Sequence, residues 1–503
     1  MSHRDSDDVQ SVDSQSINES SFDQDRVRVL SLIRQYGRFA SAFQVLEDGY
    51  SYWFWSDDSG RECVVAYLVT GGCAVVVGQP IAPQDILKDA LSAFRQFSDA
   101  NQWRLLLAGV EEWTLSHLGP ELDHFDVVKI GEQPEWDCQN YTIEGAENKT
   151  LRAQINRAKN KAVSIQKIQA TPSGEFEGTA TLAIRHVMTR WMDARPIGIL
   201  KFMVSLDPLS FAYEKRYFLA LHKGQPVGFL AAVPVYDRGG WFFEDVIRTP
   251  DAPNGTSELL IHTAMMDAQS AGDRFVTLGL APLARLSTNL KTEAVIGPLG
   301  RRALSWVKGL YDFDGLYRFK GRFNPHRWTP QYILKSQRVT HFRATTALLR
   351  AFTPNSTWGF VFDSFRRLLG RVKPRFWSSL LAVQCLILVP WTALLANADG
   401  AFWFGDKSVQ VAWVVFNGLL AAGLLSLSAL LKVQHSAAPR LSMFLAGATL
   451  TDFVLSTVQA ISLHGQVQGW AAVFVAMGIL GPALATVVLW CISIGTAMRA
   501  ARR

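Results

Sequence analysis

Four long apolar runs near the C-terminal end limit the folds that this chain can adopt more than any other feature of its sequence. Three of them contain no charged residue and the other carries one aspartate; the runs are Phe376–Ala396, Val409–Leu431, Leu441–Leu463 and Trp470–Ser493. About 20 consecutive apolar residues are enough for a helix to cross a bilayer, and no globular core needs four such runs in series. The sequence therefore predicts an all-α, four-helix transmembrane domain over residues 376–498.

Basic residues around these runs predict the orientation of the chain. Positive charges precede the first run, recur between the second and third at Lys432 and Arg440, and return at the end with Arg499, Arg502 and Arg503. The loops on the other side, NADGAFWFGDKS and HGQVQG, hold a single Lys between them. Because basic loops stay in the cytoplasm, we expect a multi-pass protein of a bacterial inner membrane, with its soluble domains and both termini in the cytoplasm.

Two features of the membrane part allow two interpretations each. Asp452 lies in the middle of the third run, and it is either functional or a neutral carboxyl bonded to a neighbouring helix. Residues 341–375 alternate apolar and basic positions at helical spacing, as in FRATTALLRAF and WGFVFDSFRRLLGRV. This pattern predicts an amphipathic segment that lies on the inner leaflet, and a plain domain linker is the alternative.

The composition before residue 376 differs from that of the apolar runs. Hydrophobic residues make up 49% of the whole chain and charged residues 19%, and most of the charge precedes the runs. The net charge of +6 fits a phosphate-bearing partner, or the usual cytoplasmic excess of Lys and Arg in a membrane protein. Five scattered cysteines without a CxxC pair predict neither a disulfide framework nor a metal site. Residues 1–25 are polar and acidic, which predicts a disordered tail and not a signal peptide.

Between residues 26 and 340, strand-like and helix-like runs alternate, which predicts an α/β soluble part. The strand-like runs are ECVVAYLV, CAVVVG, RLLLAGV, RYFLALHKGQPVGFLAAVPVY, GGWFFEDVI and RFVTLGL. The helix-like runs are DILKDALSAFRQFSDA, TATLAIRHVMTRWMDA and ELLIHTAMMDAQSAG. In the second half, a hairpin is followed by a turn, a helix and a strand, and this order resembles the core of GNAT acyltransferases.

The stretch EDVIRTPDAPNGTSELL, residues 244–260, contains the predicted anion site. A strand ends with Asp245 and Arg248, a Pro/Asn/Gly turn follows, and a helix begins there. Backbone amides at such a helix start bind anionic groups. The corresponding GNAT loop binds the pyrophosphate of coenzyme A and is rich in glycine. Here Gly255 is the one glycine, and Pro253 lacks an amide donor, which argues against acetyl coenzyme A as the donor.

Several blocks in order give the chain a resemblance to the phosphatidylglycerol lysyltransferase (multiple peptide resistance factor) family over about residues 30–340. The blocks are AVVVGQP, VVKIGEQPEWD, LRAQINRAKNKA, EDVIRTPDAPNGTSELL, LGLAPL and LYRFKGRFNPHRWTPQYI. Gln79 stands where the family has Asp, and Arg322 where it has Lys. The resemblance implies tandem GNAT-like domains, here residues 26–160 with a basic helix at the end, and residues 161–340. In many members a membrane domain precedes the catalytic part, whereas here the apolar runs follow it.

What the resemblance implies is an enzyme that moves an amino acid from aminoacyl-tRNA to a hydroxyl of an anionic phospholipid, usually phosphatidylglycerol. Such lipid modification is linked to antimicrobial peptide resistance in the family. Transfer from an ester that is already activated needs no cofactor. It needs aligned reactants, stabilisation of the carbonyl oxygen and help with one proton.

The candidate catalytic residues are Asp245, Arg248 and Lys320. Asp245 can hold the α-ammonium of the donor or assist the proton, and Arg248 can grip a phosphate with its two-pronged guanidinium. An ion pair between these two residues is the structural alternative. Lys320, together with Arg322, offers positive charge at the end of the second domain, and a solvated basic strand is the alternative.

Further candidates lie on the turn and on the basic helix. Asn254, Gly255, Glu258 and Arg322 are the candidate substrate-binding residues, although Asn254, Thr256 and Glu258 can equally serve as helix caps. The basic helix supplies candidate nucleic-acid contacts through Lys149, Arg152, Arg157, Lys159 and Lys161, with Lys167 beyond it. A solvated helix face is the alternative. His186 and Trp191 lie on a predicted helix near the cleft, and His186 is expected to be a packed core histidine and not a catalytic one. Trp328 and Tyr332 are expected in the core, with packing beneath the site as the alternative.

Two other functional classes remain open at this point. One is a GNAT-type acyltransferase that takes an acyl group from a thioester and acts on a lipid or another membrane substrate. The other is a membrane protein without catalytic activity that senses or carries lipid. In that last case Asp245 and Lys320 would tolerate replacement by Ala.

Overall fold

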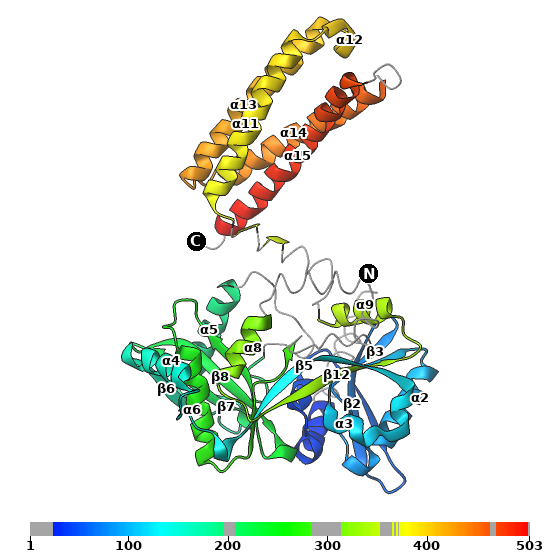
Figure 1. Ribbon diagram of the computed structural model, residues 1–503, viewed down its shortest axis with the longest axis vertical. Helices are drawn as coiled ribbons and strands as arrows, with labels where there is room; N and C mark the ends of the chain where they lie inside the picture. Colours follow the sequence, from blue (N-terminus) through cyan, green and yellow to red (C-terminus); the bar gives the residue numbers. More distant parts are fainter. Residues whose placement is uncertain are drawn as a thin grey trace, which may run out of the picture. The chain divides into compact units, whose positions relative to one another are not determined.

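The computed structural model describes residues 24–194, 207–282, 313–352, 365–366, 369–370, 372–462 and 469–500. It contains two compact units, one formed by described residues before position 353 and the other by those after position 364 (Figure 1). The predicted disordered tail falls almost wholly outside the described residues, and so does much of the predicted interfacial segment.

The first unit is built on one mixed, 12-stranded sheet whose strands run in the order β1-β2-β3-β4-β12-β5-β10-β9-β8-β7-β6, with β11 paired to β5. The strands are β1 (Ser51–Ser56), β2 (Glu62–Thr70), β3 (Cys73–Val77), β4 (Arg104–Glu111), β5 (Phe125–Asp137), β6 (Val163–Ile168), β7 (Arg216–His222), β8 (Gln225–Val235), β9 (Gly240–Arg248), β10 (Phe275–Thr277), β11 (Ala281–Pro282) and β12 (Arg327–Ser336). Every run that was predicted as a strand from the sequence contributes to this sheet.

Each half of the sheet contains the same local arrangement. In the first half, the antiparallel hairpin β2–β3 leads through helix α2 (Leu87–Ala100) to β4, which is parallel to β3. In the second half, the hairpin β8–β9 leads through α6 (Thr256–Ser270) to β10, which is parallel to β9. Parallel neighbours require such a crossover helix. The predicted α/β class with two similar parts is therefore confirmed.

Strands β5 and β12 join the two halves into one sheet, and neither was predicted as a strand from the sequence. β12 lies between β4 and β5, although it follows β10 and β11 in the chain. Both strands carry a proline, Pro134 and Pro330, and many polar side chains. Such composition is unusual inside a sheet, so local patterns did not reveal these strands. The predicted boundary at residues 160/161 stays a prediction.

Helices cover both faces of the sheet. The helix over residues 24–36, together with α9 (His341–Phe352), packs on one face of the first half, and α2 packs on the other. On the second half, α5 (Ala180–Ala194) covers one face, whereas α4 (Lys149–Asn160) and α6 cover the opposite face. Of the predicted interfacial segment, α9 buries Ala344 and Ala347 in the core and leaves Phe342 exposed. Its contact with a membrane stays a prediction.

The second unit contains four long apolar helices, as predicted. They are α11 (Pro374–Asn397), α13 (Lys407–Lys432), α14 (Ala438–Ser462) and α15 (Trp470–Ala500), and the short helix α12 (Gly400–Phe404) lies between the first two. All four are long and apolar enough to cross a membrane. Only 6% of the most apolar stretch of α15 is buried within the protein. Apolar surface left uncovered over such a length suits lipid as the surrounding solvent.

Candidate functional site

The predicted strand, turn and helix form as expected around residues 244–260. β9 ends at Arg248 and α6 begins at Thr256, whose Oγ1 donates to the Pro253 carbonyl at 2.7 Å. Gly255 has a φ of +95°, and a Cβ at this position would lie 2.0 Å from the Gln154 carbonyl oxygen of α4. Glycine is thus required here for the close packing of α6 on the basic helix. Asn254 is exposed on the same turn.

The structure brings two predicted substrate-binding residues together at the start of α6. Glu258 is buried in the first helical turn, and Arg322 follows α8 (Phe313–Gly321) in the chain. The Arg322 Nη1 lies 3.4 Å from Glu258 Oε1, and its side chain remains 45% exposed. The guanidinium therefore keeps donors available to solvent or to a bound anion.

Asp245 and Arg248 do not form the ion pair that the sequence left open. Side chains alternate between the faces of a strand, so residues three apart point to opposite sides. Asp245 shares a face with Ile247, which packs against α5, whereas the Arg248 Cβ lies on the face of Leu260 in α6. Arg248 Nη1 donates to the Ala252 carbonyl at 3.3 Å, which ties the turn to the strand.

Asp245 lies in a buried group of charged side chains that the sequence analysis did not identify as a group. It is 8% exposed, and neighbouring Glu244 accepts a hydrogen bond from Gln44 Nε2 at 2.8 Å. Burial and the charge of Glu244 raise the pKa of Asp245 to about 8, against the opposing effect of Lys215. Burial also raises the pKa of Glu244. Lys215 is itself buried and donates to the Asp207 carbonyl at 3.1 Å.

A splay in the sheet lies beside this group. β9 pairs with β10 only from Gly240 to Phe242, while its remaining residues pair with β8 alone. An irregularity in the β8–β9 register places Glu244 as the extra residue, directly before Asp245. The second half of β9 therefore has one edge without a ladder partner among the described residues.

Lys320 is bonded to the segment that follows β10, the neighbour of β9 in the sheet. Its Nζ donates to the carbonyls of Leu278, Gly279 and Leu280 at 2.7, 2.9 and 2.9 Å, so all three of its donors are used. Burial lowers the pKa of Lys320 to about 7, whereas the three carbonyls favour the protonated ammonium. Lys320 therefore holds the segment that follows β10 in place, and the ammonium that was predicted to offer positive charge is bonded to these three carbonyls.

The basic helix α4 exposes most of its predicted nucleic-acid contacts. Lys149, Arg157, Lys159 and Lys161 are exposed, and none has an acidic partner in the part of the chain that the structure describes. Arg152 differs, because its Nη1 donates to the backbone carbonyls of Ile143 and Gly145. Four cations on one short exposed segment make a surface suited to phosphates.

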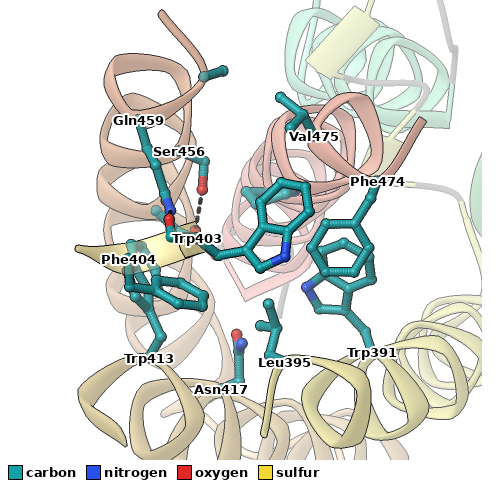
Figure 2. A pocket seen from close by; sticks show the side chains of 14 residues that line it. Trp391, Leu395, Trp403, Phe404, Trp413, Asn417, Ser456, Gln459, Phe474 and Val475 are labelled. Carbon is teal, nitrogen blue, oxygen red and sulfur yellow. Dashed lines mark hydrogen bonds between the residues drawn. The ribbon is translucent and has the colours of Figure 1, made fainter. Parts of the chain in front are cut away.

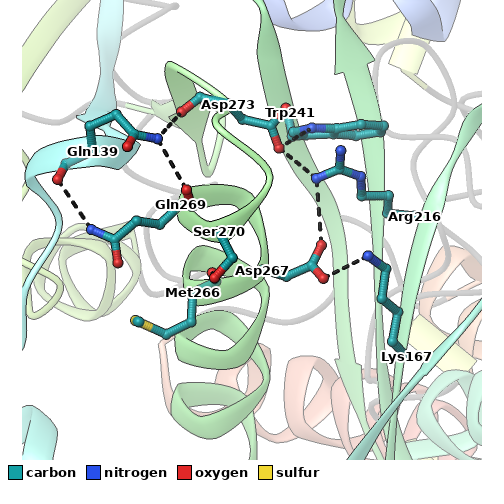
Figure 3. A network of polar contacts seen from close by, with 9 residues as sticks. All are labelled: Gln139, Lys167, Arg216, Trp241, Met266, Asp267, Gln269, Ser270 and Asp273. Carbon is teal, nitrogen blue, oxygen red and sulfur yellow. Dashed lines mark hydrogen bonds and ion pairs between the residues drawn. The ribbon is translucent and has the colours of Figure 1, made fainter.

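Lys167, which the sequence grouped with these cations, belongs to a structural network instead (Figure 3). Its Nζ lies 2.6 Å from Asp267 of α6. Arg216 contacts Asp267 and Asp273, and Trp241 Nε1 donates to Asp273 at 3.0 Å. This network fastens α6 to the strands beneath it.

A second buried polar cluster, also missed by the sequence analysis, occupies the joint between the two halves. Arg238 donates from both terminal nitrogens to Glu135, at 2.9 Å each, and Arg327 adds a contact of 2.6 Å. Although burial opposes ionisation, the two arginines lower the pKa of Glu135 to about 2. Nearby, burial raises the pKa of Glu111 to about 7, and Glu111 Oε1 and Gln331 Nε2 are buried without partners among the described residues. These residues explain the polar composition of β5 and β12.

The structure places the predicted core residues, together with Trp191, at different depths. His186 is exposed and lines a surface groove beside α5, so its assignment to the core is wrong. Trp191, Trp328 and Tyr332 are half-buried, and the Trp328 ring lies 4.4 Å from that of Tyr317. Within the described residues, no group of three or more His, Cys, Asp or Glu side chains could hold a metal ion.

Solved structures with this fold support the architecture. A structure titled "The structure of L-PGS from Bacillus licheniformis" aligns with a TM-score of 0.54 and 18% identity, and the match covers 65% of this chain and 97% of that one. The C-terminal domain of a protein from Agrobacterium fabrum aligns with a TM-score of 0.55 and 16% identity, over 67% of this chain and 99% of that one. These similarities establish the fold alone.

Curated relatives match the same region. A phosphatidylglycerol lysyltransferase of Staphylococcus epidermidis is 18% identical over 58% of this chain and 34% of its own length. The lysylphosphatidylglycerol biosynthesis bifunctional protein LysX of Nocardia farcinica is 24% identical over 59% of this chain and 26% of its own length. The chain thus spans about a third or less of these relatives. Residues 30–335 match the family described as "Phosphatidylglycerol lysyltransferase, C-terminal", and the chain therefore belongs to this family.

Proposed function

We propose that this protein is a membrane-bound transferase that moves an aminoacyl group from an aminoacyl-tRNA to a hydroxyl of phosphatidylglycerol. Family membership supports lipid aminoacylation, and the apolar helices support action at a membrane. The observation that carries the finer assignment is the buried Asp245, with its raised pKa, at the splayed edge of β9.

The proposed reaction is a transesterification. The lipid hydroxyl oxygen attacks the aminoacyl carbonyl carbon, the bond to the ribose oxygen of the tRNA breaks, and the hydroxyl proton ends on that ribose oxygen. Burial and the charge of Glu244 raise the pKa of Asp245 towards neutral pH, and a carboxyl with such a pKa is suited to accept and return a proton there. Asp245 is therefore the proposed proton carrier. Glu244 and Lys215 are positioning residues, since Glu244 raises the pKa of Asp245 and Lys215 lowers it.

The phosphate groups of the two substrates would lie on the α6 side of the sheet, and the reacting carbonyl would lie at the edge of β9 without a ladder partner, where it could reach Asp245 on the α5 side. Exposed cations on α4 are proposed to bind the phosphates of the tRNA, and Arg322, with Asn254 and the turn at Gly255, to bind the lipid phosphate. α4 and α6 are in direct contact at Gly255, so both anions would lie near one another. Pro253 in this turn lacks an amide donor that the pyrophosphate of coenzyme A would use, and no observation favours an acyl thioester as the donor.

The first experiment measures transfer directly. Membranes that contain the full chain would be incubated with total tRNA, synthetases, labelled amino acids and phosphatidylglycerol, with and without ribonuclease, and label in the organic extract would be counted. We expect ribonuclease-sensitive label in the lipid. Label that resists ribonuclease, or none with any amino acid, would contradict the proposed donor and lead to tests of acyl thioesters.

Two variants connect this activity to the proposed site. Asp245→Asn keeps the shape of the side chain and removes its titration, and we expect transfer to fall by a factor of about 100 or more. The control is Asp251→Asn, a surface aspartate of the adjoining turn whose side chain is 60% exposed. Equal activity of Asp245→Asn and the wild type would contradict the role of Asp245.

A further inference from the structure

The second unit contains a pocket whose lining combines aromatic rings with buried polar groups (Figure 2). Its volume is about 70 Å³. The pocket lies where α11 and α14 end and where α13 and α15 begin, with α12 beside it, so it is at the opposite end of the unit from Lys432 and Arg440. None of its residues belongs to the site proposed for transfer.

Five aromatic side chains form most of the wall. Figure 2 shows Trp403, Phe474 and Trp391 on one side of the pocket, and Phe404 and Trp413 on the other. The ring centre of Phe474 lies 4.5 Å from that of Trp391 and 5.1 Å from that of Trp403. Aromatic rings that line a small space can bind an alkylammonium group there, because the face of an aromatic ring attracts a cation.

Two polar side chains at the pocket have unused bonding capacity. Asp452 is 7% exposed and accepts a hydrogen bond from Ser456 Oγ at 3.0 Å, but no basic residue of the described chain pairs with it. Asn417 is 3% exposed, and its amide has no hydrogen-bond partner among the described residues. Figure 2 shows the Asn417 side chain directed into the pocket. Buried polar groups inside a membrane are costly unless a partner arrives, so both are placed to receive a ligand.

We propose that this pocket binds the primary ammonium group of a phospholipid headgroup. The ammonium would lie among the rings, opposite Asp452, with Asn417 accepting one of its N–H donors. The small volume suits an ammonium and its methylene, with the phosphate and acyl chains outside. The proposal builds on the proposed function, because an aminoacylated phosphatidylglycerol carries such an ammonium, whereas phosphatidylglycerol itself does not.

Binding can be tested with the purified full chain in detergent. Short-chain lysyl-phosphatidylglycerol, phosphatidylethanolamine and phosphatidylglycerol would be titrated by calorimetry. We expect the ammonium lipids to bind at least tenfold more tightly than phosphatidylglycerol. Tighter binding of lysyl-phosphatidylglycerol than of phosphatidylethanolamine would identify the aminoacylated lipid as the occupant, and the reverse order would identify the ordinary amine lipid. Equal binding of all three would overturn the proposal.

Matched variants locate the binding to this pocket. Asp452→Asn keeps the hydrogen bond from Ser456 but removes the charge, and we expect it to lose at least tenfold in affinity for the ammonium lipids. Asp406→Asn is the control, because Asp406 is an exposed N-cap residue of α13 and Asn caps a helix equally well. Trp403→Leu should also weaken binding, whereas Trp490→Leu, at a position that is 54% exposed, should not.

Unchanged affinity in Asp452→Asn would overturn the proposal even if Trp403→Leu failed to fold. The transfer assay is read separately from these titrations, because the lipids here are supplied ready-made. Loss of transfer with intact ammonium binding would contradict the proposed function and not the pocket. Intact transfer with no preference for ammonium lipids would contradict the pocket and not the function.

Discussion

Gly255 lies so close to α4 that a single added carbon would be 2.0 Å from the Gln154 carbonyl oxygen. This relationship joins the start of α6 to the basic helix, and thus the proposed lipid site to the proposed tRNA surface. It also shows why the one glycine of the turn is needed, although the glycine-rich loop of a coenzyme A site is absent.

Replacing Gly255 by Ala tests this packing. We expect a loss of about 2–4 kcal/mol in the free energy of unfolding, because the positive φ and the backbone clash both oppose a side chain. Gly272→Ala is the control, since its φ is also positive at +78° but a Cβ there meets nothing within 4 Å. Denaturant unfolding of both variants gives the comparison, and equal losses would show that the α4 contact is unimportant.

The buried Asp245 predicts a pH dependence of stability. Its pKa rises from an ordinary value of 3.8 to about 8 in the folded protein, so the folded state holds a proton that the unfolded state releases. Stability should therefore fall as pH rises from about 4 to about 8 and change little above that, by a few kcal/mol in all. Unfolding measured across this range should show a smaller decline for Asp245→Asn. An equal decline in both proteins would show that a group other than Asp245 causes the pH dependence.

Lys320 is expected to act through structure. Lys320→Met leaves the three carbonyls of Leu278, Gly279 and Leu280 without their donor, which should cost about 3–5 kcal/mol of unfolding free energy and reduce transfer. Arg318→Met, at an exposed position of the same helix, should have little effect. A stable Lys320→Met protein without transfer activity would instead show that the amine acts directly on the substrate.

The exposed cations of α4 predict salt-dependent binding of tRNA. Replacing Lys149, Arg157, Lys159 and Lys161 by Ala should weaken binding and reduce the slope of log affinity against log salt by about 3. Filter binding of tRNA over a range of salt concentrations measures that slope. Lys88→Ala, at an exposed lysine of α2, is the control. An unchanged slope in the fourfold variant would place the tRNA on another surface.

Structural features that depend only on residues close together in the sequence could be predicted without the structure. Apolar runs of sufficient length define the four long helices, because every backbone group of a helix is bonded within its own segment. The strand, turn and helix around Arg248 and Thr256 also follow from local periodicity and turn residues. The resemblance to the family rests likewise on short blocks whose order is visible in the chain.

The positions of the charged groups depended on contacts between distant segments. The sequence left open an ion pair between Asp245 and Arg248, but side chains alternate along the strand and these two point to opposite faces. The group around Asp245 is completed by Lys215 and Gln44, which come from other parts of the chain. The sequence predicted positive charge at Lys320, whereas the three carbonyls that its ammonium contacts belong to a segment about 40 residues earlier in the chain. In the second unit, Asp452 was visible as an isolated charge, yet only the packing of the helices placed it among aromatic rings. Local sequence predicts the four long helices and many of the strands. The central strands β5 and β12, and the burial and pairing of charges, depend on the tertiary structure, because strand pairing joins distant segments and electrostatic energies depend on distances across the fold.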